Sequence, residues 1–112
     1  MPPTIRIRKG DTSSIQYQIM DFDEVTSSLL PVDLSNKNVY YSSYIEKTSE
    51  WPTTDDPCDI IDADQGWVEH KLTEDEVVDI QFMQVKFNVE DKTSGDITIY
   101  PRYDAQYIYV ME

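Results

Sequence analysis

A run of strict alternation in the second half of the chain constrains the fold more than any other feature. Between Ile80 and Glu90 the sequence reads IQFMQVKFNVE, and every second residue from Met83 to Val89 is apolar. Successive side chains of a β-strand point to opposite faces, so this period of two predicts a long strand with one buried face. A helix would need apolar residues three or four positions apart. The segment therefore predicts a β-rich chain.

The same alternation recurs along the rest of the chain. It predicts about eight short strands, separated by a longer connection over residues 23–36, a loop over residues 48–57 and several tight turns. The expected strands read TIRIRK, SIQYQIM, KNVYYSSYIE, CDIID, GWVEHKL, IQFMQVKFNVE, DITIYP and AQYIYVM. Short, mostly antiparallel strands of this kind predict an all-β sandwich of two sheets. A length of 112 residues suits a single domain over residues 1–112.

Turn and helix signals complete the local prediction. Gly10-Asp11 and the segment 94–96 have the glycine chemistry of β-hairpin turns. Thr73 and Glu76 have the spacing of a helical capping box, and acidic residues crowd the positions between them. We therefore expect one or two turns of helix over residues 73–78, between two strands.

The charge of the chain limits the partners it can bind. The sequence has 22 acidic and 9 basic side chains, a formal net charge of −13. Such a field favours solubility and repels phosphates and anionic lipids, which argues against nucleic-acid and membrane partners. The charge is also uneven, because residues 1–10 hold three basic and no acidic side chains, whereas residues 48–70 hold seven acids and neither Lys nor Arg. These two regions could meet complementary patches on a partner or on a second copy.

The reactive side chains do not form a catalytic pattern. Cys58 is the single cysteine, which excludes an internal disulfide, and it stands among acids with no neighbouring cation to activate it. His70 is the single histidine and is in phase with the apolar residues of its strand, so we expect it to be packed and hydrogen-bonded. The stretch Asp62–Gly66 begins like a calcium loop, but its glycine comes one residue early, and a solvated turn is expected. We expect no enzyme activity, metal or cofactor.

Aromatic residues are the remaining candidates for function. Tyr40 and Tyr44 fall on the face of their strand opposite the expected core residues, and Trp51 stands in the acidic loop. Four further tyrosines gather near the C-terminus: Tyr100, Tyr103, Tyr107 and Tyr109. Exposed aromatic side chains are typical of protein interfaces and of surfaces that stack on sugars. Cross-strand pairing that strengthens the sheet is the alternative explanation.

Several motifs, in the same order along the chain, resemble the N-terminal domain of the baseplate upper protein family of tailed phages. The first is KGDTSSIQYQI, a strand preceded by a K-G-D-T turn. The others are PVDLSNKNVYY, DADQGWVEHKLTEDE, MQVKFNVED and IYPRYDAQYIYV, at positions 31–41, 62–76, 83–91 and 99–110. The resemblance spans nearly the whole chain. It implies an immunoglobulin-like sandwich that serves as an attachment module of a virion.

On this resemblance, the basic first strand with Arg6, Arg8 and Lys9 offers an edge for an acidic neighbour. The leading hypothesis is a non-enzymatic structural protein that is assembled in the host cytoplasm and docks onto a tail or baseplate protein of the virion. A capsid decoration protein that stabilises the phage head is the first alternative. A carbohydrate-binding module that stacks host sugars on Trp51 and the tyrosines is the second. The expected partners are other virion proteins, either tail or baseplate proteins or the major capsid protein, and a second copy of the chain is a further candidate.

Overall fold

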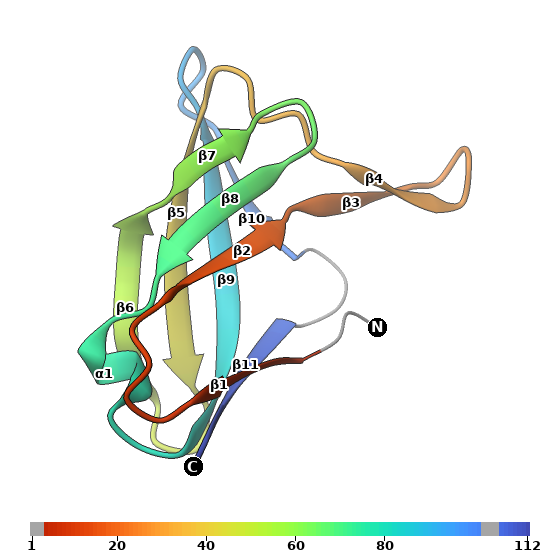
Figure 1. Ribbon diagram of the computed structural model, residues 1–112. Helices are drawn as coiled ribbons and strands as arrows, with labels where there is room; N and C mark the ends of the chain where they lie inside the picture. Colours follow the sequence, from red (N-terminus) through yellow and green to blue (C-terminus); the bar gives the residue numbers. More distant parts are fainter. Residues whose placement is uncertain (1–3, 102–105) are drawn as a thin grey trace.

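A computed structural model describes residues 4–101 and 106–112 and shows the all-β architecture in Figure 1. The described residues form eleven strands and one short helix, rather than the eight strands expected. The elements are β1 (Ile5–Arg8), β2 (Ser14–Gln18), β3 (Met20–Asp23), β4 (Ser28–Pro31), β5 (Lys37–Ile45), β6 (Glu50–Pro57), β7 (Asp59–Asp62), β8 (Trp67–Lys71), α1 (Glu74–Val77), β9 (Gln81–Asp91), β10 (Ile97–Tyr100) and β11 (Gln106–Met111).

Two sheets face each other across the core. The larger sheet has the order β1-β11-β9-β5-β6, and β10 pairs with the C-terminal half of β9. The smaller sheet has the order β2-β8-β7. If β2, β7 and β8 are equated with strands B, D and E, and β5, β9 and β11 with C, F and G, the two layers are those of an immunoglobulin-like sandwich. The predicted all-β sandwich is confirmed.

The first strand pairs differently from what its turn predicts. A hairpin at Gly10-Asp11 would join β1 to β2, but β1 lies in the larger sheet, parallel to β11, and β2 lies in the smaller sheet. The other described strand pairs are antiparallel. The Gly10 N–H donates to the Val77 carbonyl at 2.8 Å and the Lys9 N–H donates to the Met111 carbonyl at 2.6 Å. The turn is thus anchored to α1 and β11 and carries the chain from one sheet to the other.

The alternation in β9 orients the larger sheet. Met83, Val85, Phe87 and Val89 are buried, as predicted, while the residues between them are intermediate. The ring of Tyr17 in the smaller sheet stacks on Phe87 with centroids 4.8 Å apart, which joins the two layers. The even-numbered residues of β9 therefore point away from the core, and they define the outer face of the larger sheet.

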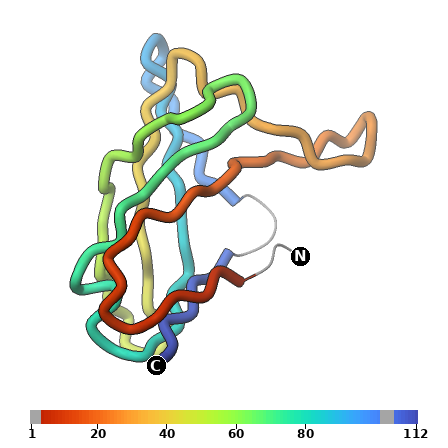
Figure 2. The backbone as a smooth tube through the Cα atoms, in the orientation of Figure 1, coloured from red at the N-terminus to blue at the C-terminus, as the bar shows by residue number. Residues whose placement is uncertain are grey.

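Two segments expected to be connections contain strands. The connection expected over 23–36 contains β4 and the last residue of β3. These two strands form an antiparallel hairpin, here called the arm (residues 20–31), which extends away from the two sheets in Figures 1 and 2. The expected loop over 48–57 contains β6, the edge strand beside β5. Pro52 and Pro57 are the reason that β6 was predicted to be a loop. Proline is tolerated in an edge strand, because the backbone N–H groups on one side of that strand form no ladder hydrogen bonds.

Helix α1 begins with the predicted capping box. The Thr73 hydroxyl accepts from the Glu76 N–H at 3.3 Å, and the Glu76 carboxylate accepts from the Thr73 N–H at 3.1 Å. The helix is a single turn, Glu74–Val77, and its buried side chains Glu76 and Val77 point into the sandwich. Among the described residues, no helix is long and apolar enough to cross a membrane.

Candidate functional site

The strand register gathers most of the predicted interface residues on the outer face of the larger sheet. Tyr109 of β11 is opposite Phe82 of β9 on one side and Arg6 of β1 on the other, so these three side chains share a face. The other predicted residues of these strands are placed in the same way, because each of them is opposite a residue of β9 or β11 whose side chain points outward. The predicted residues on this face are Arg6, Arg8, Tyr40, Tyr44, Tyr107 and Tyr109, with Trp51 of β6 in contact with Tyr44.

Two predicted residues, Lys9 and Tyr100, have other positions. Lys9 follows β1 in the exposed turn, at the end of the larger sheet rather than on its outer face. Tyr100 is opposite Phe87, so it faces inward and is buried instead of contributing to an exposed cluster. Tyr103 lies outside the described residues.

An aromatic cluster forms the part of the outer face nearest β11. The Phe82 ring stacks on Tyr107 with centroids 4.7 Å apart and meets Tyr109 at 6.1 Å in a tilted arrangement. Phe82 remains 49% exposed, so the cluster presents an apolar surface to solvent. Phe82 was not among the predicted interface residues, although the alternation that places Met83 in the core also turns Phe82 outward.

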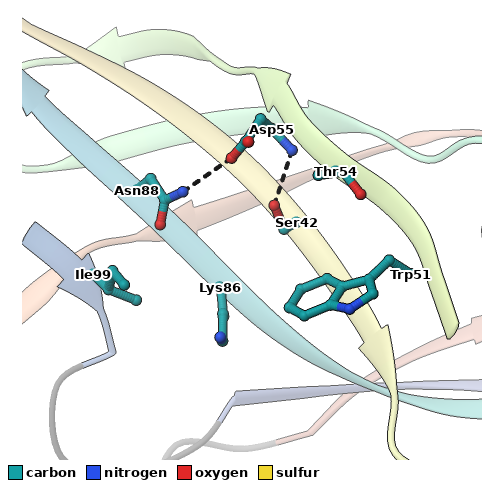
Figure 3. A pocket seen from close by; sticks show the side chains of 7 residues that line it. All are labelled: Ser42, Trp51, Thr54, Asp55, Lys86, Asn88 and Ile99. Carbon is teal, nitrogen blue, oxygen red and sulfur yellow. Dashed lines mark hydrogen bonds between the residues drawn. The ribbon is translucent and has the colours of Figure 1, made fainter. Parts of the chain in front are cut away.

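A second part of the outer face is an open pocket of about 280 Å³ between β5, β6, β9 and β10 (Figure 3). The Trp51 ring forms one wall, with the Lys86 ammonium 5.1 Å from its centroid. Asn88 donates to the Asp55 carboxylate at 2.9 Å. Ser42 and Thr54 supply hydroxyl groups, and Ile99 adds an apolar wall. The pocket combines an aromatic surface, a cation and fixed hydrogen-bonding groups.

The backbone at Asp55 is shaped to build this pocket. Its φ of 47° lies in the left-handed region, which is unfavourable for a residue with a Cβ. The Ser42 hydroxyl accepts from the Asp55 N–H at 2.9 Å, and the register of β5 and β6 shifts on both sides of Ser43. These irregularities turn the Asp55 carboxylate toward Asn88. Bulges that redirect a side chain in this way are common next to functional sites.

Strand β10 extends the apolar part of the face. Ile97 is opposite Glu90, and Ile99 is opposite Asn88, so both isoleucines point outward. Ile97 is 58% exposed and Ile99 is 50% exposed. Neither was predicted as an interface residue, even though the alternation in DITIYP contained the signal. Phe82, Ile97 and Ile99 together make the outer face more apolar than the tyrosines alone suggested.

The ionisable groups inside the sandwich form a separate, closed network. Glu76 accepts from the Tyr41 hydroxyl at 2.6 Å and lies 2.8 Å from Nε2 of His70. The His70 ring stacks on Tyr41 with centroids 3.5 Å apart, and the Asp56 carboxylate is 3.3 Å from Nδ1, without the alignment of a hydrogen bond. The expectation that His70 is packed and hydrogen-bonded is confirmed. Because His70 and Glu76 are both buried, the network joins the two sheets and α1 rather than facing a ligand.

Burial and hydrogen bonding act in opposite directions on this network. Burial raises the pKa of Glu76, but hydrogen bonds from His70, Tyr41 and Thr73 lower it more, and the net pKa is about 2. Burial raises the pKa of Tyr41 well above its ordinary value, and the Glu76 charge raises it further. Glu76 is thus a charged acceptor and Tyr41 a neutral donor at neutral pH. Within residues 4–101 and 106–112, no group of three or more His, Cys, Asp or Glu side chains is placed to hold a metal ion.

Comparison with solved structures relates the fold to a phage protein. The chain is similar to the "N-terminal domain of phage TP901-1 ORF48", with a TM-score of 0.61 and 10% sequence identity. The match covers 97% of this chain and 83% of that one. No family model and no curated protein matches the sequence. The similarity shows a shared fold that extends over nearly the whole chain, while membership of the baseplate upper protein family stays a prediction.

Proposed function

We propose that this chain is a non-enzymatic structural protein of a tailed-phage virion, and that it docks onto a tail or baseplate protein through the outer face of its larger sheet. The observation that carries the proposal is the placement of seven predicted interface residues on this single face. The fold it shares with a domain of a phage protein agrees with this role. So does the ordered resemblance of its motifs to an N-terminal attachment domain.

The chemistry of the outer face suits a protein partner. Aromatic and arginine side chains are enriched in the centres of protein interfaces, and clusters of them supply most of the binding energy. The aromatic cluster of Phe82, Tyr107 and Tyr109 would form the apolar centre of such a contact, with Arg6 and Arg8 at its margin. The Trp51 pocket lies farther across the same face and could receive a single side chain of the partner.

Labelling of virions tests this proposal directly. An antibody against the chain, conjugated to gold, is applied to purified particles of the phage that carries the sequence and viewed by electron microscopy. Label at the tail tip supports docking onto a tail or baseplate protein. Label over the head would replace this proposal by the capsid decoration alternative, and absence of label from all particles would remove the virion role.

A matched pair of variants tests the proposed face. Phe82→Ser with Tyr107→Ser removes the centre of the aromatic cluster, and we expect particles assembled with this variant to lose the label. Ile61→Ser is the control, because Ile61 is also exposed but belongs to β7 in the smaller sheet. Equal labelling with both variants would show that the outer face does not dock. A glycan array addresses the sugar alternative, which requires binding that depends on Trp51.

A further inference from the structure

We propose that copies of this chain associate head to tail, with the arm of one copy docked against β1 of the next, beside the aromatic cluster. The inference goes beyond the proposed function and does not depend on it, because it concerns contacts between identical chains. Its two parts are an acidic, aliphatic arm and a basic, aromatic acceptor, which lie at separate places on the same molecule.

The arm has the exposure of a docking element. Its strands β3 and β4 pair with each other and with no other described strand, and a two-stranded hairpin is only marginally stable in water by itself. Three aliphatic side chains on it are nevertheless exposed: Val25 at 93%, Leu29 at 60% and Leu30 at 45%. Aliphatic side chains concentrated on a projecting element are typical of a segment that another surface covers.

The charge of the arm defines the surface that can cover it. Asp23 ends β3 and Glu24 follows it in the turn, and residues 10–36 contain five acidic residues but neither Lys nor Arg. A surface that accepts the arm must therefore offer apolar contacts to the aliphatic residues and positive charge to the acids. An acidic or purely polar surface would leave the arm repelled or exposed.

Strand β1 and its surroundings meet both requirements. Arg6 and Arg8 are exposed on the outer face, and the Arg8 guanidinium donates to the backbone oxygen of Glu112 at 3.2 Å. Among the described residues, no side-chain carboxylate forms an ion pair with either arginine. Tyr109 is opposite Arg6, and the exposed ring of Phe82 lies next to it. In addition, β1 is the edge strand of its sheet as far as residues 4–101 and 106–112 are concerned, and no strand in these ranges pairs with its second backbone edge, which can receive an added strand.

The occupant is a second copy because the chain carries both complementary surfaces and cannot bring them together itself. The arm extends away from β1 in Figures 1 and 2. The net charge of −13 does not prevent the contact, because salt screens charges more than about 8 Å apart at physiological ionic strength, while touching pairs keep most of their attraction. Donor and acceptor are different surfaces, so the contact repeats from copy to copy and produces a ring or a filament.

Complementary charge reversal tests the contact. Variant A carries Arg6→Glu and Arg8→Glu, and variant B carries Asp23→Lys and Glu24→Lys. In variant A the arm and the acceptor are both acidic, and in variant B both are basic, so the self-association of each variant is weakened by repulsion between like charges. In a mixture, however, each arm meets an acceptor of opposite charge. Sedimentation velocity is measured for the original chain, for each variant and for an equimolar mixture, from about 10 µM to about 1 mM, the range in which weak contacts form.

We expect the original chain to sediment above its monomer mass of 13.1 kDa as concentration rises. Variants A and B should each associate roughly 100-fold more weakly, since like charges across an interface repel strongly, and the mixture should regain association. Control variants with the same changes in net charge are Lys71→Glu with Lys92→Glu and Glu46→Lys with Asp96→Lys. These residues are exposed, belong neither to the arm nor to β1, and should leave association like that of the original chain. Leu29→Ser with Leu30→Ser should also abolish association without changing the melting temperature of the sandwich.

Three results would overturn the inference. The first is that the original chain stays monomeric up to about 1 mM. The second is that variants A and B associate as well as the original chain. The third is that the mixture of A and B stays monomeric while the original chain associates. None of these results depends on the virion. If the chain is monomeric but the antibody labels the phage tail, the head-to-tail contact is refuted and the proposed function stands. If the chain associates but no particle is labelled, the proposed function is refuted and the head-to-tail contact stands.

Discussion

Replacing Glu76 by glutamine tests how strongly the buried network stabilises the sandwich. The Glu76 side chain is fully buried and accepts hydrogen bonds from groups on β5, β8 and the start of α1: the Tyr41 hydroxyl, Nε2 of His70 and the Thr73 N–H. Glutamine has nearly the same shape but no charge, and its amide group offers hydrogens where the carboxylate only accepts. The substitution therefore keeps the packing and weakens the charged hydrogen bonds.

The pKa of Glu76 sets the size and the pH dependence of the effect. It is about 2 in the folded chain, against an ordinary value of 4.5. A carboxyl group whose pKa is lowered by folding stabilises the folded state above its unfolded pKa, and this stability is lost as the pH falls toward the folded pKa. The difference between the two values corresponds to about 3 kcal/mol, which is present at pH 7 and disappears between pH 4.5 and pH 2.

Urea unfolding at a series of pH values measures this contribution. At pH 7 we expect the free energy of unfolding of Glu76→Gln to be lower than that of the original chain by about 3 kcal/mol. This difference in unfolding free energy between the original chain and Glu76→Gln should become steadily smaller below pH 4.5, as the carboxylate of the original chain takes up a proton. Glu74→Gln is the matched control, because Glu74 is exposed in the same helical turn, and its smaller gap should change little with pH.

Two results would refute this reasoning. One is an unfolding free energy of Glu76→Gln equal to that of the original chain at pH 7, which would mean that the charged hydrogen bonds add nothing over neutral ones. The other is a gap that stays constant from pH 7 to pH 2.5, which would mean that the carboxylate does not carry the effect. In either case the network would be a packing feature only.

Three further predictions concern the core. Gly66→Ala should lower the free energy of unfolding by at least about 2 kcal/mol in thermal unfolding. Gly66 has a φ of +74°, and the Cβ of an alanine there would lie 2.6 Å from a backbone oxygen. Gly95→Ala is the control and should cost less, because Gly95 has a similar φ but open space around it. Burial and nearby carboxylates raise the pKa of Cys58 to about 12, so the folded chain should react with iodoacetamide at pH 8 far more slowly than the urea-unfolded chain. Tyr41→Phe removes the hydroxyl that donates to Glu76 and should lower the unfolding free energy by about 2 kcal/mol in urea titrations.

The outer face could be predicted from the sequence because strand alternation is a local property. Once Val39 and Tyr41 are assigned to the core, Tyr40 must point outward, and the same holds for Tyr107 and Tyr109 on either side of Ile108. Which strands lie side by side is not local. The contact of Phe82 with Tyr107 depends on the pairing of β9 with β11, which are separated in the sequence by β10, and no short stretch of sequence encodes it.

The strand pairing at the first turn also could not be predicted from the local sequence. The sequence around Gly10 has the chemistry of a hairpin, and Gly10 does adopt a positive φ of 87°. Nothing local distinguishes a turn that pairs its two strands from one that carries the chain to another sheet. The choice is decided by the Met111 and Val77 carbonyls, which accept from this segment and belong to β11 and α1, both far from it in the sequence. The parallel pairing of β1 with β11 follows from these distant contacts.

The capping box at Thr73 was predicted correctly, but the prediction covered only one of the contacts that Glu76 makes. The S/T-x-x-E spacing predicts that the Glu76 carboxylate reaches back to the Thr73 N–H, and it does. The spacing alone does not predict that the same carboxylate also contacts His70 and Tyr41, which come from strands in opposite sheets. A solvent-exposed cap and a buried link between two layers share one sequence signature, and only the packing distinguishes them.

The separation of this network from the outer face decides how docking variants can be interpreted. Tyr41 points inward from β5 and holds Glu76, whereas its neighbours Tyr40 and Ser42 point to the opposite side of the same strand. A substitution at Phe82 or Trp51 removes contacts that are already half exposed and leaves the inward-facing contacts intact. Loss of docking in such a variant, with an unchanged melting temperature, would therefore report on the interface itself rather than on the stability of the sandwich.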